Sequence, residues 1–340
     1  MSLSARDLFD TPDHYLMAYE GEQAIFVGMD RAAYGRSIFL DARIQAARAG
    51  RIAVPSAAMA GYGDTLALPS TTGWIFHTAH CGSTLLARAL DRADTLVLRE
   101  PMALRQMGID PAVGTPDWSA RLRLTARMLS RRYRPDAPVI VKANVPVNFI
   151  LPQLMALDPQ APAILLYYPL RTYLLAILRS PDHRRWVNSV TGEMASAIEA
   201  LAGPIAGLDD AERAAALWLA QMRIYADALA GFPNTRSLDA ETLFDQPQSV
   251  LAAAFSLYGV SVSAFDIDAI VASDLFATYA KNPGVKFDNS VRRARQAALS
   301  QTLAGDVDRA VAWVEARAAR YPVVTSLAKP LTGQAPLLLA

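Results

Sequence analysis

Cysteine and net charge are what this sequence has least of. Its 340 residues include one cysteine, Cys81, and 33 Lys and Arg stand against 32 Asp and Glu, a formal net charge of +1. A single cysteine excludes an internal disulfide framework and fits a reducing compartment, so we expect a cytoplasmic protein. Balanced charge gives no long-range field to gather nucleic acid or an anionic membrane, so neither is an expected partner and any anion site must be local.

Long apolar runs are missing as well. Residues 6–13 carry one arginine and three aspartates where a secretory peptide needs a continuous apolar stretch, so export is not expected. The most apolar window, Ala161–Leu178, contains two prolines and Arg171. It is also shorter than the roughly 20 residues that a membrane-spanning helix needs. We therefore expect a buried strand that runs into a helix.

The composition nevertheless allows a large core, because 52% of the residues are apolar. We expect one α/β domain over residues 71–330, with a peripheral N-terminal segment over 1–70 packed on it and a tail over 331–340. Residues 1–70 alternate short apolar runs such as Ala24–Val27 with Gly and Pro, which is typical of peripheral elements. There are no repeats and no low-complexity tracts.

After Pro69 the pattern changes to apolar strands that alternate with helices. Strands without polar alternation, separated by helices, indicate a central parallel sheet flanked by helices. The predicted strands are Gly73–His77, Thr95–Leu98, Val139–Val141 and Ile164–Tyr168. The predicted helices are Ser83–Arg92 and Val147–Leu157 and, in a helical C-terminal half, Ala211–Leu229, Gln248–Tyr258 and Gln301–Arg320.

The segment from Gly73 to Thr84 places a strand, a tight turn and a helix start in consecutive order. Gly82 lets the backbone turn and approach a ligand closely, and Ser83 and Thr84 supply hydroxyls beside the free N–H groups of the first helical turn. Together they predict a site for a phosphate or sulfate group. The alternative is that Ser83 is only a helix N-cap.

The spacing also resembles a Walker loop, with Gly82 as its second glycine and Thr84 as its hydroxyl residue. However, His77 replaces the first glycine, and Ser83 stands where the lysine that neutralises a triphosphate belongs. No apolar strand ends in an Asp placed to hold magnesium, which disfavours simple NTP hydrolysis. A nucleotide-dependent kinase or other phosphotransferase therefore stays as an alternative.

The run from His80 to Leu86, His-Cys-Gly-Ser-Thr-Leu-Leu, resembles the 5′-phosphosulfate loop of the sulfotransferase family. The resemblance implies a P-loop-like fold and the donor 3′-phosphoadenosine 5′-phosphosulfate (PAPS), used without a metal. It also implies that the loop binds the donor's 5′ group. The residues of the loop are His80, Cys81, Gly82, Ser83 and Thr84.

The resemblance continues downstream and covers roughly residues 73–180. In tyrosylprotein-type and related sulfotransferases, a second strand ends in a catalytic Glu and a later strand in a Lys near the transferred sulfonate, and Glu100 and Lys142 stand at those positions. It implies that Glu100 acts as general base and that Lys142 stabilises the moving group, with His80 beside them as a third catalytic residue. Otherwise Glu100 pairs with Arg99 or Arg105, and Lys142 is a surface lysine.

Three positions depart from the family pattern. His80 stands where the loop usually has Lys or Arg, so it supplies charge only when protonated. At the family's 3′-phosphate motif, Tyr168 and Ala176 replace an Arg and a Ser, while Arg171 is retained. If PAPS is the donor, the missing charge must come from the basic segment Tyr279–Arg295. Its candidate residues are Lys281, Lys286, Arg292 and Arg293.

Other residues have simpler interpretations. A phosphatase-type thiolate at Cys81 needs an arginine at Ala87, one position before Arg88, so Cys81 is interpreted as a small loop residue. His77 and His80 are too few for a zinc site, and no metal is expected. Asn144 is interpreted as a helix cap rather than a ligand.

Two further groups lie outside the motifs. Residues 184–186, Arg-Arg-Trp, fall in an expected loop that could contact an acceptor, and Trp218 is expected in the core. The sequence thus predicts transfer of a sulfonate from PAPS to an acceptor hydroxyl or amine on a small molecule or peptide. A catalytically silent nucleotide-binding protein is the second alternative, and neither the acceptor nor the oligomeric state is readable.

Overall fold

The computed structural model describes residues 4–66 and 71–339. The chain forms two compact units. The first contains the described residues up to Ile75, together with 87–163 and 255–261. The second contains residues 76–86, 164–254 and the described residues from Val262 onward.

The central sheet has five strands in the order β5-β6-β4-β7-β8. The strands β4 and β5 each pair in parallel with β6, which confirms the predicted α/β fold with a central parallel sheet. Every residue of β4, β5, β6 and β7 is buried, so these strands show no polar alternation. Their bounds are β4 (Gly73–His77), β5 (Leu96–Arg99), β6 (Val139–Lys142), β7 (Ala163–Tyr167) and β8 (Thr235–Asp239).

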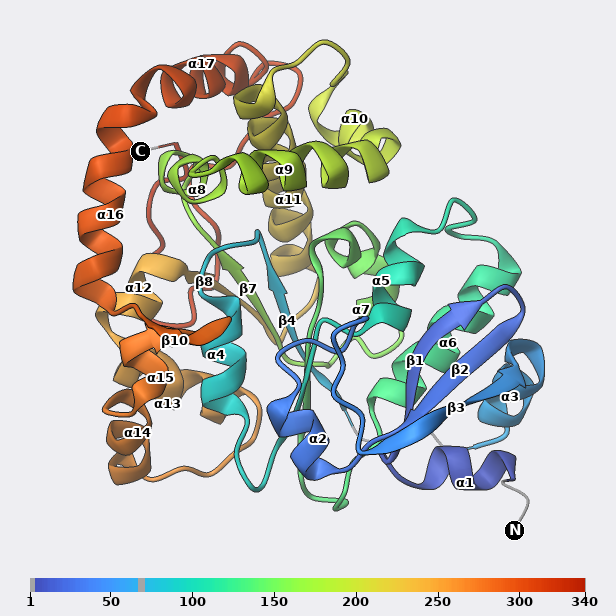
Figure 1. Ribbon diagram of the computed structural model, residues 1–340. Helices are drawn as coiled ribbons and strands as arrows, with labels where there is room; N and C mark the ends of the chain where they lie inside the picture. The colour runs from blue at the N-terminus through green and yellow to red at the C-terminus, as the bar shows by residue number, and fades with distance from the viewer. Residues whose placement is uncertain (1–3, 67–70, 340) are drawn as a thin grey trace. The chain divides into compact units, whose positions relative to one another are not determined.

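A second, antiparallel sheet of the first unit is formed by β1 (His14–Glu20), β2 (Gln23–Gly28) and β3 (Arg48–Pro55), drawn in blue in Figure 1. The apolar run Ala24–Val27 is the buried part of β2. Helices α5 and α6 contact β1, and α3 contacts β2 and β3. Helices of this unit include α1 (Ala5–Asp10), α2 (Arg31–Arg36), α3 (Ser56–Asp64), α5 (Met102–Ile109) and α6 (Pro116–Leu129).

The predicted α-helix Val147–Leu157 was wrong over its first half, where the chain forms another type of helix. A 3₁₀ helix, η1 (Val145–Ile150), precedes the short α7 (Leu151–Met155). Pro152 has no N–H, so it cannot donate to the carbonyl four residues earlier as a continuous α-helix requires. The Leu151 N–H instead donates to the Asn148 carbonyl, three residues back.

The predicted long helices are present in the second unit with changed ends. The first is α11 (Asp210–Gly231), which contacts α8, α9, α10, α17 and β8. Trp218 on α11 is fully buried, as expected, and donates to the Tyr168 carbonyl at 2.9 Å. The predicted helix Gln301–Arg320 is interrupted at Leu303, which ends α16 and precedes α17.

The expected loop at residues 184–186 was also wrong, because these residues lie in α9 (Pro181–Glu193). Ser180 caps α9 by accepting from the His183 N–H, and Pro181 occupies the first helical position, a combination that favours a helix start. Among the described residues, no helix is long and apolar enough to cross a membrane.

The remaining elements complete the chain. Helix α4 (Ser83–Leu90) begins in the second unit and ends in the first, and α13 (Pro247–Leu257) also has residues in both. The other elements of the second unit are α8 (Leu170–Ile177), α10 (Ala195–Ala202), α12 (Ala240–Asp245), α14 (Ala264–Val271), α15 (Asp274–Ala277), β9 (Thr278–Tyr279), β10 (Asn282–Lys286), α16 (Asn289–Thr302) and α17 (Ala304–Glu315).

Candidate functional site

The loop between β4 and α4 has an unusual backbone. Ala79 and His80 have φ of 73° and 50°, and Gly82 has φ of 83°. Left-handed conformations at non-glycine residues cost about 1–3 kcal/mol each and persist only where surrounding contacts hold them, often at ligand sites. Here the Ala79 N–H donates to His77 Nδ1 at 3.1 Å, and the Thr78 N–H donates to the Leu166 carbonyl of β7 at 3.1 Å.

Gly82 is required by space as well as by its φ. A Cβ built at this position would lie 2.8 Å from Phe244 Cζ and 3.2 Å from Leu243 Cδ2. Contacts under about 3.0 Å force a neighbour to move, so no side chain fits without a shift of Phe244. Gly82 therefore allows a close approach between the loop backbone and Phe244, and its predicted approach to a ligand stays a prediction.

The start of α4 supplies the two hydroxyls. Ser83 and Thr84 are buried, at 4% and 3% exposure. The buried Thr84 Oγ1 has no hydrogen-bond partner among the described residues. A buried hydroxyl beside the free N–H groups of a helix start is suited to an anionic ligand.

Cys81 packs inside the protein. It is fully buried, and its Sγ lies 3.7 Å from the Leu166 carbonyl oxygen. It is absent from the described lining of the pocket below. This agrees with its interpretation as a small loop residue, and its predicted contact with the donor stays a prediction.

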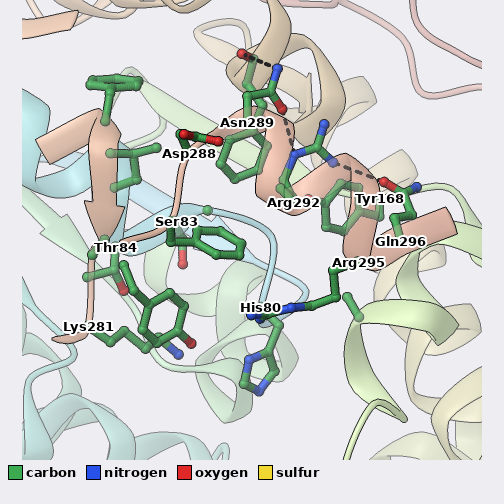
Figure 2. Close-up of a pocket in the computed structure, with 18 of the residues that line it drawn as sticks. His80, Ser83, Thr84, Tyr168, Lys281, Asp288, Asn289, Arg292, Arg295 and Gln296 are labelled. Atoms are coloured by element: carbon green, nitrogen blue, oxygen red, sulfur yellow. Dashed lines mark hydrogen bonds between the residues drawn. The ribbon is translucent and has the colours of Figure 1, made fainter. Parts of the chain in front are cut away.

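A pocket of about 1040 Å³, partly open to solvent, lies wholly within the second unit. It unites three regions that are far apart in the sequence (Figure 2), and Phe244 of α12 lines it as well. The loop contributes His80 and residues 82–85, the end of β7 and the face of α8 contribute a second wall, and residues 275–299 contribute the third. The lining combines aromatic rings with a few polar and charged side chains, as small-molecule sites commonly do.

The second wall contains the positions that depart from the family motif. Tyr168 and Ala176 both line the pocket. Arg179, which the sequence analysis missed, lines it as well and donates to the Tyr279 hydroxyl at 3.3 Å. The sequence contained a signal that could have identified Arg179. Spacings of four and three residues, which place side chains on one face of a helix, separate Thr172, Ala176 and Arg179.

The basic segment contributes to the third wall. Lys281, Arg292 and Arg295 line the pocket, and Figure 2 shows Arg295 extending toward His80. Lys286 and Arg293, the other candidates, are not among the described lining residues. Arg171 is not among them either, and its exposed side chain pairs with Asp308 at 3.1 Å. The pocket thus gives no support to the predicted donor contact of Arg171.

Arg292 is held by protein groups. It forms a two-point ion pair with Glu241, at 2.7 and 2.8 Å, and donates to the Asn289 and Gln296 side-chain oxygens. Its guanidinium also lies 4.5 Å from the Phe244 ring centroid. We therefore interpret Arg292 as a residue that shapes the pocket wall, and its predicted role as a direct phosphate ligand stays a prediction.

His80 does not supply a ready positive charge. Burial lowers its pKa well below 6.5, and the positive Lys281 nearby, followed by His183, Arg179 and His77, lowers the pKa further. The His80 ring lies 4.3 Å from the His183 ring, and its buried Nδ1 has no hydrogen-bond partner among the described residues. His80 is therefore neutral before a ligand binds, unlike the Lys or Arg of the family loop.

The two strand-end residues of the first unit form an ion pair. Lys142, the last residue of β6, is fully buried and pairs with the Glu100 carboxylate directly after β5. This excludes the alternative of a surface lysine. Glu100 has φ of 55°, a conformation that few non-glycine residues adopt. Such outliers cluster at active sites.

Register places the pair at one edge of the sheet. Lys142 pairs with Arg99 of β5 and with Ile75 of β4, and the chain runs on from Ile75 through His77 into the loop. Ligands of parallel α/β sheets bind at the carboxyl ends of strands. Asn144 heads η1, but its side chain makes no capping hydrogen bond, so the capping interpretation was wrong.

Comparison with known proteins finds similarity to two solved sulfotransferase structures. The sulfotransferase domain from the curacin biosynthetic pathway has 13% identity and a TM-score of 0.43, over 70% of this chain and 99% of that chain. A sulfotransferase from Alicyclobacillus acidocaldarius has 14% identity and a TM-score of 0.36, over 74% of this chain and 97% of that chain. No family model and no curated protein matches the chain. Residues 4–66 and 71–339 contain no group of three or more His, Cys, Asp or Glu that could hold a metal.

Proposed function

We propose that this protein is a sulfotransferase that transfers a sulfonate from PAPS to an acceptor hydroxyl or amine. The observation that carries the proposal is the pocket of the second unit. Its lining joins the anion loop and the motif positions Tyr168 and Ala176, which the family resemblance assigns to one nucleotide, with the basic segment that was expected to replace the missing charge.

The residues of this pocket fit a nucleotide with two separate anionic groups. Ser83 and the unpartnered Thr84 hydroxyl would hold the 5′ group together with the N–H groups that begin α4. Arg179, Lys281 and Arg295 would replace the missing Arg and Ser at the 3′-phosphate. The pocket also contains rings that offer a stacking surface for a base, including Phe276 and Tyr279.

PAPS, when bound, supplies an activated sulfonate. The Glu100 carboxylate would take the proton of the acceptor hydroxyl or amine as the acceptor atom bonds to sulfur, and the bond from sulfur to the 5′-phosphate oxygen would break with its electron pair on that oxygen. The Lys142 ammonium would stabilise negative charge on the sulfonate oxygens. The ion pair and its place at the strand ends support these roles.

Calorimetric titration with 3′-phosphoadenosine 5′-phosphate, 5′-AMP and ATP tests the proposal, with magnesium and with chelator. We expect the 3′,5′-bisphosphate to bind at least about tenfold more tightly than 5′-AMP, since a hydrogen bond to a charged group contributes roughly 1.5–3 kcal/mol. The preference should persist in chelator.

Two other outcomes would overturn the proposal. Magnesium-dependent preference for ATP would favour a phosphotransferase. The protein with its Glu100–Lys142 pair intact could also bind the bisphosphate but transfer no sulfonate to a panel of phenols, alcohols and amines. That result would favour the silent nucleotide-binding protein.

A further inference from the structure

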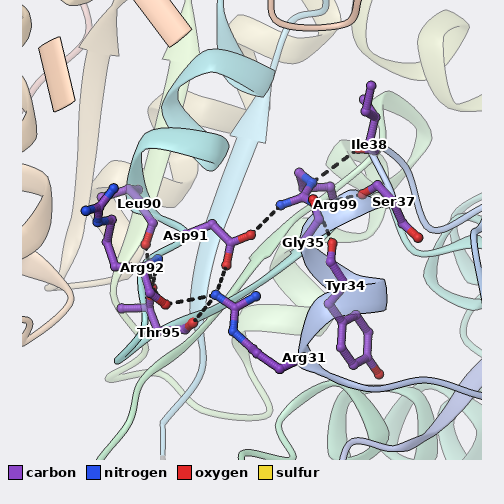
Figure 3. Close-up of polar contacts among 10 residues, drawn as sticks. All are labelled: Arg31, Tyr34, Gly35, Ser37, Ile38, Leu90, Asp91, Arg92, Thr95 and Arg99. Carbon is purple, nitrogen blue, oxygen red and sulfur yellow. Dashed lines mark hydrogen bonds and ion pairs between the residues drawn. The ribbon is translucent and has the colours of Figure 1, made fainter. Parts of the chain in front are cut away.

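A buried arginine lies directly before Glu100. Arg99 is 2% exposed and donates through Nη1 to Asp91 Oδ2 at 2.8 Å (Figure 3). Its Nη2 and Nε donate to four backbone carbonyls of a segment more than sixty residues away in the sequence, which we call the strap (residues 34–40). The acceptors are Tyr34 at 2.5 Å, Ser37 at 2.6 Å, Gly35 at 3.1 Å and Ile38 at 3.2 Å.

Asp91 is shared between two arginines. Arg31 Nη2 donates to Asp91 Oδ1 at 2.6 Å and also to the carbonyls of Arg92, at 2.8 Å, and Thr95, at 3.1 Å. Figure 3 shows the Asp91 carboxylate between the Arg31 and Arg99 guanidiniums. Arg31 therefore ties the start of α2 to the turn before β5, whereas Arg99 ties the strap carbonyls to Asp91.

The strap in turn contacts Lys142 and the residues on either side of Glu100. The Leu40 N–H donates to the Arg99 carbonyl at 2.8 Å, and the Leu40 carbonyl accepts from the Met102 N–H at 3.0 Å. These two bonds bracket the turn at Glu100. Phe39, the preceding strap residue, is buried, and its ring centroid lies 5.8 Å from Lys142 Nζ.

We propose that Arg99 is a positioning residue for the Glu100–Lys142 pair. Arg99 fixes the strap, Leu40 then holds the turn at Glu100 in its left-handed conformation, and Phe39 covers the ammonium of Lys142. A left-handed residue other than glycine keeps its conformation only while its surroundings hold it. The consequence for catalysis rests on the proposed function, but the positioning can be measured without turnover.

Competitive acetylation followed by mass spectrometry measures the exposure of Lys142, with the exposed Lys286 as internal reference. The matched variants are Arg99→Lys and Arg31→Lys, which change the two partners of the same carboxylate. A lysine at 99 keeps the charge but loses the fork that reaches several carbonyls. We expect Arg99→Lys to raise Lys142 labelling about tenfold, the change that accompanies loss of one charge-assisted hydrogen bond, and Arg31→Lys to leave it near wild type.

Equal labelling of Lys142 in the two variants, or wild-type labelling in Arg99→Lys, would overturn the proposal. Circular dichroism checks that both variants fold. If Arg99→Lys does not fold, Phe39→Leu probes the same link, since its smaller side chain should also raise Lys142 labelling while Arg99 stays in place. Wild-type labelling in Phe39→Leu would count equally against the strap.

Kinetics separate this proposal from the proposed function. We expect Arg99→Lys to lower kcat while KM for the donor stays constant, with Glu100→Gln as the lower limit of activity. A wild-type protein that transfers no sulfonate would refute the proposed function, and the labelling would still decide the positioning. An active wild type with unchanged kcat in Arg99→Lys would refute the positioning role alone.

Discussion

The Gly82→Ala variant should lose both stability and nucleotide affinity, for two separable reasons. Alanine at φ of 83° places its Cβ against the neighbouring carbonyl oxygen. The same Cβ would lie 2.8 Å from Phe244 Cζ, so the Phe244 ring has to shift. Phe244 also lines the pocket, and the loop residue therefore couples to the ligand site directly.

The structure offers a control for the first reason. Gly207, in the same unit, has φ of 77°, and a Cβ there would meet nothing within 4 Å. Gly207→Ala should therefore cost only the backbone strain, about 1–2 kcal/mol. Gly82→Ala should cost that strain and about 1–3 kcal/mol more from overpacking. The difference between the two variants isolates the Phe244 contact.

Urea denaturation followed by circular dichroism measures the stability difference, and calorimetry with 3′-phosphoadenosine 5′-phosphate measures affinity. We expect affinity to fall about tenfold or more in Gly82→Ala, the loss of one charge-assisted contact, and to stay at the wild-type value in Gly207→Ala. Adding Phe244→Leu to Gly82→Ala should recover part of the lost stability. Wild-type affinity in Gly82→Ala, or equal destabilisation by the two single variants, would refute the reasoning.

Three further predictions concern the pocket. Lys281→Ala should weaken binding of the 3′,5′-bisphosphate about tenfold more than binding of 5′-AMP. The control Lys286→Ala, outside the described lining, should change the affinity for neither ligand. An equal loss of affinity for both ligands would show that Lys281 does not contact the 3′-phosphate. Because burial and neighbouring cations hold the His80 pKa well below 6.5 in the free protein, a bound anion should raise this pKa, so affinity should increase as pH falls through the bound-state value. Calorimetry from pH 5 to 8 should show that affinity changes more steeply with pH in wild type than in His80→Gln, where only the titration of the ligand itself remains. Identical slopes of affinity against pH would mean that His80 stays neutral. Ala176→Ser restores the family hydroxyl and should strengthen binding of the bisphosphate, relative to 5′-AMP, by about 0.5–1.5 kcal/mol. An equal gain for both ligands would show that the new hydroxyl does not contact the 3′-phosphate.

The local order of the chain was sufficient to predict the loop and the edge of the sheet. β4 has the predicted bounds, and α4 begins at the predicted Ser83. Glu100 and Lys142 were predicted to follow parallel strands, and the register of Arg99 with Lys142 brings their strand ends together. These features depend on apolar runs and turn residues within a few positions of one another, which sequence patterns report well.

The N-terminal segment shows what sequence patterns could not reach. Residues 1–70 were expected only as peripheral elements, yet the strap residues Phe39 and Leu40 contact Lys142 and the turn at Glu100. No spacing rule links these positions to residues about sixty and a hundred places later. Only tertiary packing brings the strap carbonyls within reach of Arg99.

The electrostatics of the pocket were also decided by tertiary structure alone. The sequence supplied the cations of the basic segment, but only packing showed that Glu241 holds Arg292 and that Arg179 joins the lining. Likewise, the residue type of His80 left its charge open, and burial beside Lys281 made it neutral. The sequence determined which groups can carry charge, because that is a property of each side chain. The fold determined which of them are charged and available, because desolvation and pairing depend on neighbours distant in the chain.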